Sequence, residues 1–320
     1  MKFYDVFNGD ADGLCALLQL RLATPRDAVL VSGVKRDIRL LERVEARAGD
    51  VIVVLDISLD ANRGALEQAL QNGAQVTWFD HHFPGEIPRH PAFTPHIDTD
   101  PRVCSSVLVD RHLKGRFRDW AVAAAFGDNL VQTAQELANE AGLHDAETGL
   151  LRELGLCLNY NAYGESIDDL LFSPVDLFGR MLPFTSARAF IDASDIFSAL
   201  KQRLQDDLER AGSVNVQTIA PGSAYAMLPD ESWSRRVVGV YANSLAQSDP
   251  HTAHAVLVSK KNGYLVSIRA PAANPRGASL VARAFHSGGG REGAAGIDLL
   301  PESELDRFFA TMRSTFSNRD

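Results

Sequence analysis

The stretch that decides the fold is Val76-Thr77-Trp78-Phe79-Asp80-His81-His82. Its first half is rich in β-branched and aromatic residues, which predicts a buried strand, and its end delivers an aspartate and two histidines directly into a loop. Open α/β sheets place their chemistry at this end of a strand. A carboxylate beside two imidazoles suits Mn²⁺, Fe²⁺ or Zn²⁺ better than Ca²⁺. Taken alone, the tripeptide is equally consistent with an ordinary surface loop.

Two other predicted strands end in the same way. Residues 3–7 lead into Asn8-Gly9-Asp10-Ala11-Asp12-Gly13, and the apolar residues 51–55 lead into Asp56-Ile57-Ser58. Because the carboxyl ends of parallel strands meet at one edge of a sheet, these loops are predicted to converge on a single site.

Five motifs follow one another along nearly the whole chain: Asn8-x-Asp10-x-Asp12-Gly13, Asp56, Asp80-His81-His82, Gly127-Asp128, and Gly288-Gly289-Gly290-Arg291-x-x-Ala294-Ala295-Gly296. In this order they resemble the motifs of the DHH phosphoesterase superfamily. That family includes RecJ-like exonucleases, oligoribonucleases, phosphatases of adenosine bisphosphate, and hydrolases of cyclic and linear dinucleotides. The resemblance implies a catalytic DHH domain and a smaller DHH-associated domain that holds substrate.

The pattern of elements predicts an α/β fold with two domains. Strand and helix alternate up to about Gly127, which indicates a doubly wound parallel sheet. We predict a DHH domain with a helical extension at 1–185, a linker helix at 186–212, and a smaller α+β substrate-binding domain at 213–320. Residues 28–31 are predicted to form a strand, and 38–48 and 62–71 helices. In the smaller domain we expect strands at 214–219, 224–228, 253–259 and 264–269, and closing helices at 278–285 and 302–313.

The resemblance also implies two divalent metal ions, with Mn²⁺ preferred and Mg²⁺ as the alternative. The implied metal ligands are Asn8, Asp10, Asp12, Asp56, His81 and Asp128. Asp10 and Asp56 would hold one ion, and Asp12, His81 and Asp128 the other, with Asp56 as the bridge. The implied catalytic residues are Asp56, Asp80 and His82. Asp80 would orient His81, and His82 would contact the phosphate or the leaving oxygen. Relatives mostly have His or Asp at the position of Asn8, and a neutral amide is a weaker ligand.

Candidate substrate contacts lie in both predicted domains. We predict that Gly288, Gly289 and Gly290 bind substrate, because glycines let backbone N–H groups approach an anion and because they match the substrate loop of the family that the chain resembles. Two arginines, Arg269 and Arg291, are predicted to add paired hydrogen bonds to the substrate. The family usually has His where Arg291 stands. Ser105, beside Ser106, either touches phosphate or caps a helix. The segment 158–164 either lines the cleft and stacks a base or packs its aromatic residues between helices.

The composition of the chain indicates what kind of substrate it binds. The net charge is −9, with 32 Lys and Arg against 41 Asp and Glu. Proteins that follow many phosphates usually present a broad basic surface, so we predict a short nucleotide substrate and no long nucleic acid. The chain has neither an apolar run of roughly 20 residues nor a signal-peptide pattern, which predicts a cytoplasmic protein without membrane contact. The three separated cysteines are predicted to be buried thiols. A homodimer is the predicted assembly.

The predicted function is metal-dependent hydrolysis of short oligoribonucleotides or linear dinucleotides to mononucleotides, including the dinucleotides left when cyclic dinucleotides are opened. Two alternatives stay open. One is a RecJ-like exonuclease for single strands. The other is a nucleotide-sensing module with weakened catalysis, which the residues Asn8 and Arg291 favour.

Overall fold

The computed structural model describes residues 1–317. The chain divides into two compact units, Met1–Gln202 and a second that begins at Arg203, so the border in the sequence falls inside helix α9 (Asp195–Gly212). The linker helix predicted at 186–212 is not one continuous helix. Ser194 is extended (φ −104°, ψ 133°) and separates α8 (Ala187–Ala193) from α9.

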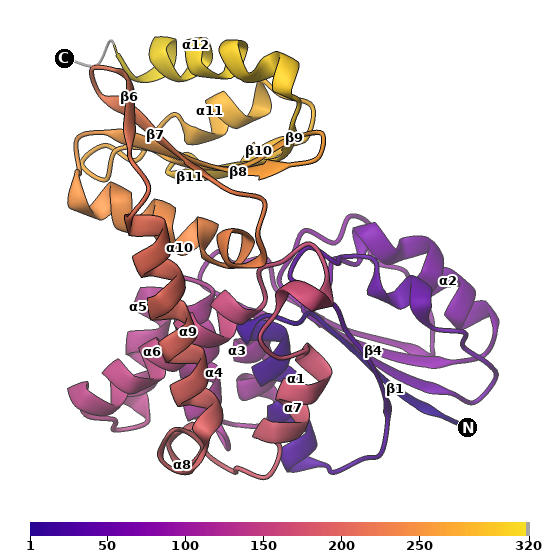
Figure 1. The fold of residues 1–320 in the computed structure, drawn as a ribbon. Helices are drawn as coiled ribbons and strands as arrows, with labels where there is room; N and C mark the ends of the chain where they lie inside the picture. Colours follow the sequence, from indigo (N-terminus) through magenta and orange to yellow (C-terminus); the bar gives the residue numbers. More distant parts are fainter. Residues whose placement is uncertain (318–320) are drawn as a thin grey trace. The chain divides into compact units, whose positions relative to one another are not determined.

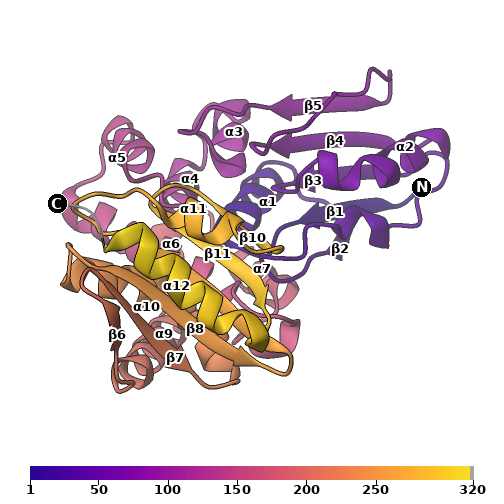
Figure 2. The ribbon, with the colours of Figure 1, turned by 90° about the horizontal axis from the view of Figure 1, so that it is seen from above.

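A five-stranded parallel sheet forms the centre of the first unit. Its order is β2-β1-β3-β4-β5, as Figure 2 shows. The strands are β1 (Phe3–Phe7), β2 (Val29–Val31), β3 (Val51–Leu55), β4 (Gln75–Asp80) and β5 (Phe93–Ile97). The chain places β2 on one side of β1 and β3 on the other, so the topology switches between β1 and β3. Ligands bind at such a switch point in open α/β sheets.

Helices cover both faces of this sheet (Figure 1). Alternate strand residues such as Val6, Ile52 and Trp78 are fully buried against Leu66 and Leu70 of α2 (Arg63–Gln71) or their neighbours in the same core. The other helices near the sheet are α1 (Ala11–Ala23), which packs on β1 and β3, and α3 (Ser105–His112), which packs on β4. The predicted doubly wound parallel sheet is confirmed.

The predicted helix over 38–48 is wrong. Only a short 3₁₀ turn, η1 (Leu40–Arg43), forms there. The side chain of Asn62 explains the difference, since its Oδ1 accepts the N–H of Leu41 at 3.3 Å and its Nδ2 donates to the carbonyl of Ile38 at 2.6 Å. These bonds take backbone groups that a continuous helix would need.

The helical extension brings one motif to the sheet edge. It consists of α4 (Arg118–Gly127), α5 (Val131–Glu140), α6 (Asp145–Asn161), α7 (Pro174–Met181) and α8. Residues 120–125 of α4 are fully buried. At Gly155 of α6 an added Cβ would lie 2.0 Å from the carbonyl oxygen of Ala123, so only glycine permits this approach of α6 to α4. The end of α4 places Asp128 beside the sheet.

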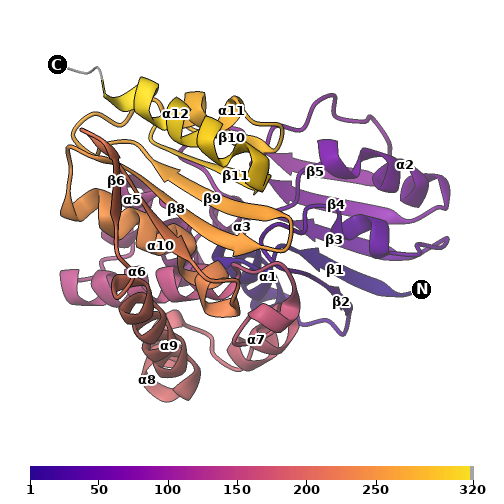
Figure 3. The same cartoon turned by 45° about the horizontal axis from the view of Figure 1, so that its top comes forward.

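The second unit is an α+β domain, as predicted. Its six-stranded sheet has the order β10-β11-β9-β8-β7-β6, with β7 and β8 parallel and the other pairs antiparallel. The first four strands in sequence are β6 (Gln217–Ala220), β7 (Ser223–Leu228), β8 (Ala253–Lys260) and β9 (Gly263–Arg269). Figure 3 shows α11 (Ala278–Arg283) and α12 (Leu305–Phe316) on one face and α10 (Ser232–Ser248) on the other.

The glycine-rich segment is part of the sheet. Gly288–Gly290 forms the edge strand β10, paired with β11 (Ala294–Leu300). Two of its glycines are required for packing, because an added Cβ at Gly288 would lie 1.8 Å from the carbonyl oxygen of Ala282, and Gly290 has φ +136°. Sequence reasoning also missed α10, which makes the crossover between the parallel strands β7 and β8.

Candidate metal centre

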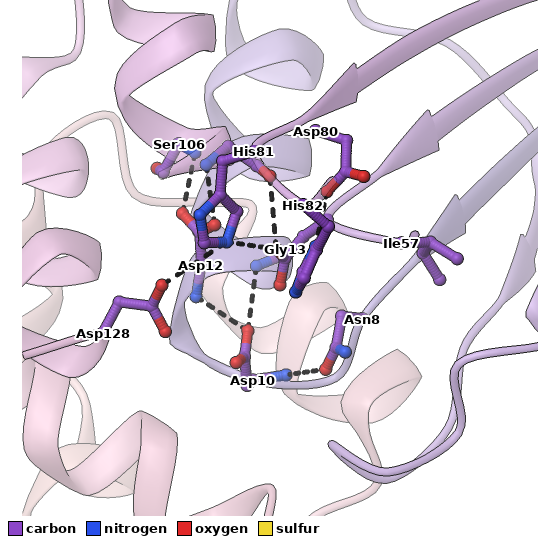
Figure 4. A network of polar contacts seen from close by, with 12 residues as sticks. Asn8, Asp10, Asp12, Gly13, Ile57, Asp80, His81, His82, Ser106 and Asp128 are labelled. Carbon is purple, nitrogen blue, oxygen red and sulfur yellow. Dashed lines mark hydrogen bonds and ion pairs between the residues drawn. The ribbon is translucent and has the colours of Figure 1, made fainter. Parts of the chain in front are cut away.

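The polar ends of three strands meet at the switch point of the parallel sheet. Asn8 and Asp10 follow β1, Asp56 follows β3, and Asp80 ends β4 and leads into two histidines. The backbone joins these ends, because the N–H of Asn8 donates to Leu55 at 3.2 Å and that of Asp56 to Phe79 at 3.0 Å. Figure 4 shows the side chains of Asp10, Asp12 and His81 gathered with Asp128, which follows α4. The predicted convergence is confirmed.

Asp10 caps helix α1. Its Oδ1 accepts the backbone N–H groups of Asp12 at 3.0 Å and Gly13 at 3.1 Å, and the Oδ1 of Asn8 accepts the N–H of Asp10 at 3.1 Å. Glycine is required at 13, since an added Cβ would lie 2.2 Å from the carbonyl oxygen of Asn8. Asn8 and Asp10 therefore build the turn and the helix start as well as facing the site.

Asp12 is anchored by the start of a second helix. Its two carboxylate oxygens accept the backbone N–H groups of Ser105 and Ser106 of α3, each at 2.7 Å. The hydroxyl of Ser105 donates to Oδ1 of Asp56 at 3.2 Å. Of the two predicted roles for Ser105, capping through its side chain is wrong because Cys104 occupies the cap position. Ser105 instead helps to fix two of the site's carboxylates.

Asp56 has a left-handed backbone, with φ +57°. Among residues other than glycine, aspartate and asparagine tolerate this conformation best, and such outliers cluster at functional sites. Its side chain is buried and lies 3.4 Å from Nε2 of His81. Burial disfavours the carboxylate, but His81, His82 and Lys35 outweigh this effect and hold the pKa of Asp56 well below its usual range.

His81 lies between carboxylates from three elements. Its Nε2 is 3.4 Å from Asp56 and 3.6 Å from Oδ2 of Asp128. Burial alone would lower the pKa of His81, but interaction with Asp56 and the charges of Asp12 and Asp128 raise it to about 10. So much negative charge around one imidazole favours a cation at this position.

The arrangement fits a divalent ion. The ligand atoms of Asp12, His81 and Asp128 lie within 4.8 Å of one another, as do those of Asp56, His81 and His82. These sets combine carboxylate oxygen with imidazole nitrogen, which suits Mn²⁺ or Zn²⁺ and, with more oxygen ligands, Mg²⁺. Asp10 belongs to neither set. The site thus brings four of the predicted metal ligands, Asp12, Asp56, His81 and Asp128, around a shared imidazole.

The predicted partner of Asp80 is wrong. Asp80 is fully buried, and its Oδ1 lies 2.7 Å from Nδ1 of His82 rather than near His81. Asp80 ends a strand, and a residue two positions further along returns to the same side. Burial raises the pKa of Asp80, although the contact with His82 acts in the opposite direction. Burial would lower the pKa of His82, but Asp80 and Asp56 outweigh it and raise that pKa. Asp80 therefore orients the second histidine and favours its protonated form.

Asp80→Asn should reduce turnover about 10–100-fold, because the loss of an orienting carboxylate behind a functional histidine costs about this much. Mn²⁺ affinity should change little, since Asp80 contacts His82 and not His81. Steady-state rates and Mn²⁺ titration measure the two effects separately. Asp98→Asn is the matched control, because Asp98 pairs with Arg111 at the surface of the same unit. Loss of Mn²⁺ binding in step with turnover would contradict this role.

Sequence reasoning missed Lys35, which follows β2. Its ammonium contacts Asp10 and lies 3.0 Å from Oδ1 of Asn159 and 3.5 Å from Oδ1 of Asp128. Burial opposes its charge, but Asp10, Tyr163 and Asp128 outweigh that effect and raise the pKa of Lys35 well above its ordinary value. The available signal was its position after a strand end, the same place in which the acidic motifs stand.

The segment 158–164 reaches the site through this lysine. Asn159 accepts its hydrogen bond, and the ring of Tyr163 lies 5.8 Å from its Nζ. Tyr160 and Asn161 are fully buried, as expected if they pack between helices and do not line a cleft.

The other predicted substrate contacts lie in the second unit. Arg269 donates to Asn243, Ser267 and the carbonyl of Gly239, so much of its guanidinium serves to join α10 to β9. Arg291 is exposed at the start of the β10–β11 turn, where its N–H donates to the carbonyl of Ala294 at 2.8 Å. Gly289 has open space beside its Cα. Their assignment to substrate binding stays a prediction.

No helix among residues 1–317 combines the length and the apolar character needed to span a bilayer.

Comparisons with known proteins agree with this geometry. Residues 214–318 match the DHHA1 domain family. No curated protein sequence matches the chain. Among solved structures, an exonuclease RecJ bound to manganese has a TM-score of 0.63 at 17% identity, covering 100% of this chain and 91% of that one. RecJ from Thermus thermophilus in complex with Mn²⁺ gives 0.62 at 17% identity, covering 100% of this chain and 52% of that one.

A third structure is the pGpG-specific phosphodiesterase PggH from Vibrio cholerae, with a TM-score of 0.54 at 13% identity. The similarity covers 98% of this chain and 100% of that one. At these identities the likeness concerns the fold. Residues 214–318 therefore match a DHHA1 domain and the chain has the fold of these RecJ and PggH structures, which agrees with the resemblance drawn from its ordered motifs.

Proposed function

We propose that this chain is a divalent-metal phosphodiesterase that hydrolyses short oligoribonucleotides or linear dinucleotides to mononucleotides. The observation that carries the proposal is the convergence of Asp12, Asp56, His81 and Asp128 at the switch point of a chain with a DHHA1 domain. Solved RecJ structures hold Mn²⁺ or Mg²⁺, which supports a divalent ion here. Mn²⁺ as the ion, and the count of two, are predictions.

One side chain of the site is placed for a proton transfer in hydrolysis. In this reaction the oxygen of water bonds to phosphorus and releases a proton to solvent, and the bond to one ester oxygen breaks as that oxygen takes a proton from an acid. A divalent ion in the site would polarise the phosphate and lower the pKa of water. His82 is placed to supply the proton to the leaving oxygen, because its side chain is 47% exposed while Asp80 fixes its Nδ1.

Charge supports a short substrate. With a net charge of −9, the protein as a whole repels a long phosphate backbone, whereas a local ion turns the field positive only near the site. The structural likeness to a pGpG-specific phosphodiesterase, which spans all of that chain, supports the same choice.

A RecJ-like exonuclease is the second candidate, because the TM-score is higher for RecJ, 0.63 against 0.54. A nucleotide-sensing module is the third, since Asn8 stands where relatives mostly carry a stronger ligand.

Catalytic efficiency should be highest for dinucleotides and fall as the substrate lengthens. The measurement is kcat/KM with Mn²⁺ at fixed ionic strength, for RNA of two to about twenty nucleotides, because electrostatic repulsion depends on both length and salt. Asp128→Ala, which removes a predicted metal ligand, is the control that attributes cleavage to this site.

Efficiency that stays level or rises with length would replace this proposal with the RecJ-like function. Tight nucleotide binding without cleavage at saturating Mn²⁺ would replace it with the sensing function.

A further inference from the structure

Lys35 is held in a fixed position beside the acidic site. Its backbone N–H donates to the carbonyl of Ala162 at 2.9 Å, and its carbonyl accepts from Nδ2 of Asn8 at 3.2 Å. Its ammonium meets Asp10, Asn159 and Asp128, one partner for each of its three hydrogens. The side chain is 27% exposed. These contacts hold the ammonium of Lys35 in one position, unlike that of a mobile surface lysine.

The position predicted for one of the two ions is already satisfied by protein groups. Oδ1 of Asn8 accepts the N–H of Asp10, Oδ1 of Asp10 accepts two N–H groups of α1, and Oδ2 of Asp10 contacts the ammonium of Lys35. An ion there would have to displace a lysine and rely on a neutral amide, which is a weak ligand. The residues present do not fit a divalent ion at Asn8 and Asp10.

The carboxylate of Asp128 lies between the position at Asn8 and Asp10 and the position at His81. Oδ1 of Asp128 lies 3.5 Å from the ammonium of Lys35, while its Oδ2 lies 3.6 Å from Nε2 of His81. In sites with two ions, the ions stand roughly 3.5–4 Å apart and share ligands in the same manner. The ammonium of Lys35 therefore contacts Asp10, a predicted ligand of the second ion, and shares Asp128 with the position that fits the first.

We propose that the ammonium of Lys35 replaces the second divalent ion, so that this chain binds one divalent ion, at Asp12, Asp56, His81 and Asp128. This inference deepens the proposed phosphodiesterase function and rests on it for its role in catalysis. An ammonium supplies positive charge and hydrogen bonds to phosphate oxygens but cannot activate water as a divalent ion does. The single ion and the lysine would thus divide the work of two ions.

The test counts ions and needs no activity. Chelated protein is reloaded with Mn²⁺ and desalted, its Mn²⁺ content is measured, and electron paramagnetic resonance distinguishes isolated ions from exchange-coupled pairs. We expect one ion per wild-type chain with the spectrum of isolated Mn²⁺. In Lys35→Met combined with Asn8→Asp, which removes the ammonium and supplies a carboxylate, we expect a second ion and an exchange-coupled spectrum.

Two variants serve as controls for the number of bound ions. Lys35→Arg keeps the positive charge, so it should still hold one ion. Lys201→Met removes a lysine that pairs with Glu153 at 2.8 Å in the same unit, and it should leave the count at one.

An exchange-coupled pair in the wild-type protein would overturn the proposal, even where the lysine variants fail to fold. A count that stays at one in the double variant, with its melting temperature unchanged, would overturn it as well. Replacement of the ion by Lys35 without any phosphodiester cleavage would uphold this inference and refute the proposed function.

Discussion

Removal of divalent ions should abolish hydrolysis by this chain, and Mn²⁺ should restore it more fully than Mg²⁺. Asp12, Asp56, His81 and Asp128 bring carboxylate oxygen and an imidazole nitrogen together, and imidazole suits Mn²⁺ better than Mg²⁺. An ion contributes several kcal/mol to the stability of the transition state, so the loss should be about 10³-fold or more.

The measurement is the rate of dinucleotide cleavage after treatment with chelator and dialysis, followed by titration with each ion. Thermal unfolding provides an independent readout, because an ion that binds only the folded state raises the melting temperature as its concentration increases. Full activity in dialysed protein would exclude metal-dependent hydrolysis. Equal restoration by both ions would contradict the predicted preference for Mn²⁺.

Asp56→Ala should reduce turnover about 10³-fold or more, the second large effect. Asp56 accepts a hydrogen bond from Ser105 at 3.2 Å and lies beside His81, so its loss removes a ligand and leaves the imidazole poorly placed. Its backbone at φ +57° strains most residues, and alanine therefore adds a cost in stability. Asp56→Asn avoids that cost, because asparagine tolerates the left-handed region, and it should lose nearly as much activity.

Ser105→Ala is the matched control. It removes only the hydroxyl that touches Asp56, while the backbone N–H that anchors Asp12 remains. We expect a loss of about tenfold, typical of a hydrogen bond to a charged group at about 1.5 kcal/mol. Turnover, Mn²⁺ affinity and melting temperature are measured for all three variants. Asp56→Asn with near wild-type turnover would exclude Asp56 from the catalytic machinery.

Much of the first unit was predictable because its signals are local. The apolar strands each end in polar residues, and the rule that parallel strands present their carboxyl ends together places Asp10, Asp56 and Asp80 at one edge. The second sheet was less predictable. Gly288–Gly290 indicates a flexible turn in sequence, yet pairing with β11 makes it an edge strand. Such pairing depends on a partner strand and not on the glycines themselves.

The pairing of residues within the site was not predictable either. The prediction that Asp80 orients His81 fails because the direction of each side chain depends on how the chain leaves the strand, and the structure pairs Asp80 with His82. A helix over 38–48 fails because Asn62, a residue outside it, takes its backbone hydrogen bonds. Both errors arise where a contact made at a distance or at a turn outweighs local propensity.

By itself the sequence determined the doubly wound parallel sheet, the presence of an acidic centre with His81, and the membership of Asp12, Asp56 and Asp128 in it. The sheet follows from strand patterns, and the membership of these residues was implied by the family resemblance that the ordered motifs carry. Only the tertiary structure revealed Lys35, because a single lysine has no periodicity and its contacts with Asp10, Asp128 and Asn159 span 25, 93 and 124 residues of sequence. Contacts of such separation exist only once the sheet and the helices around it have assembled.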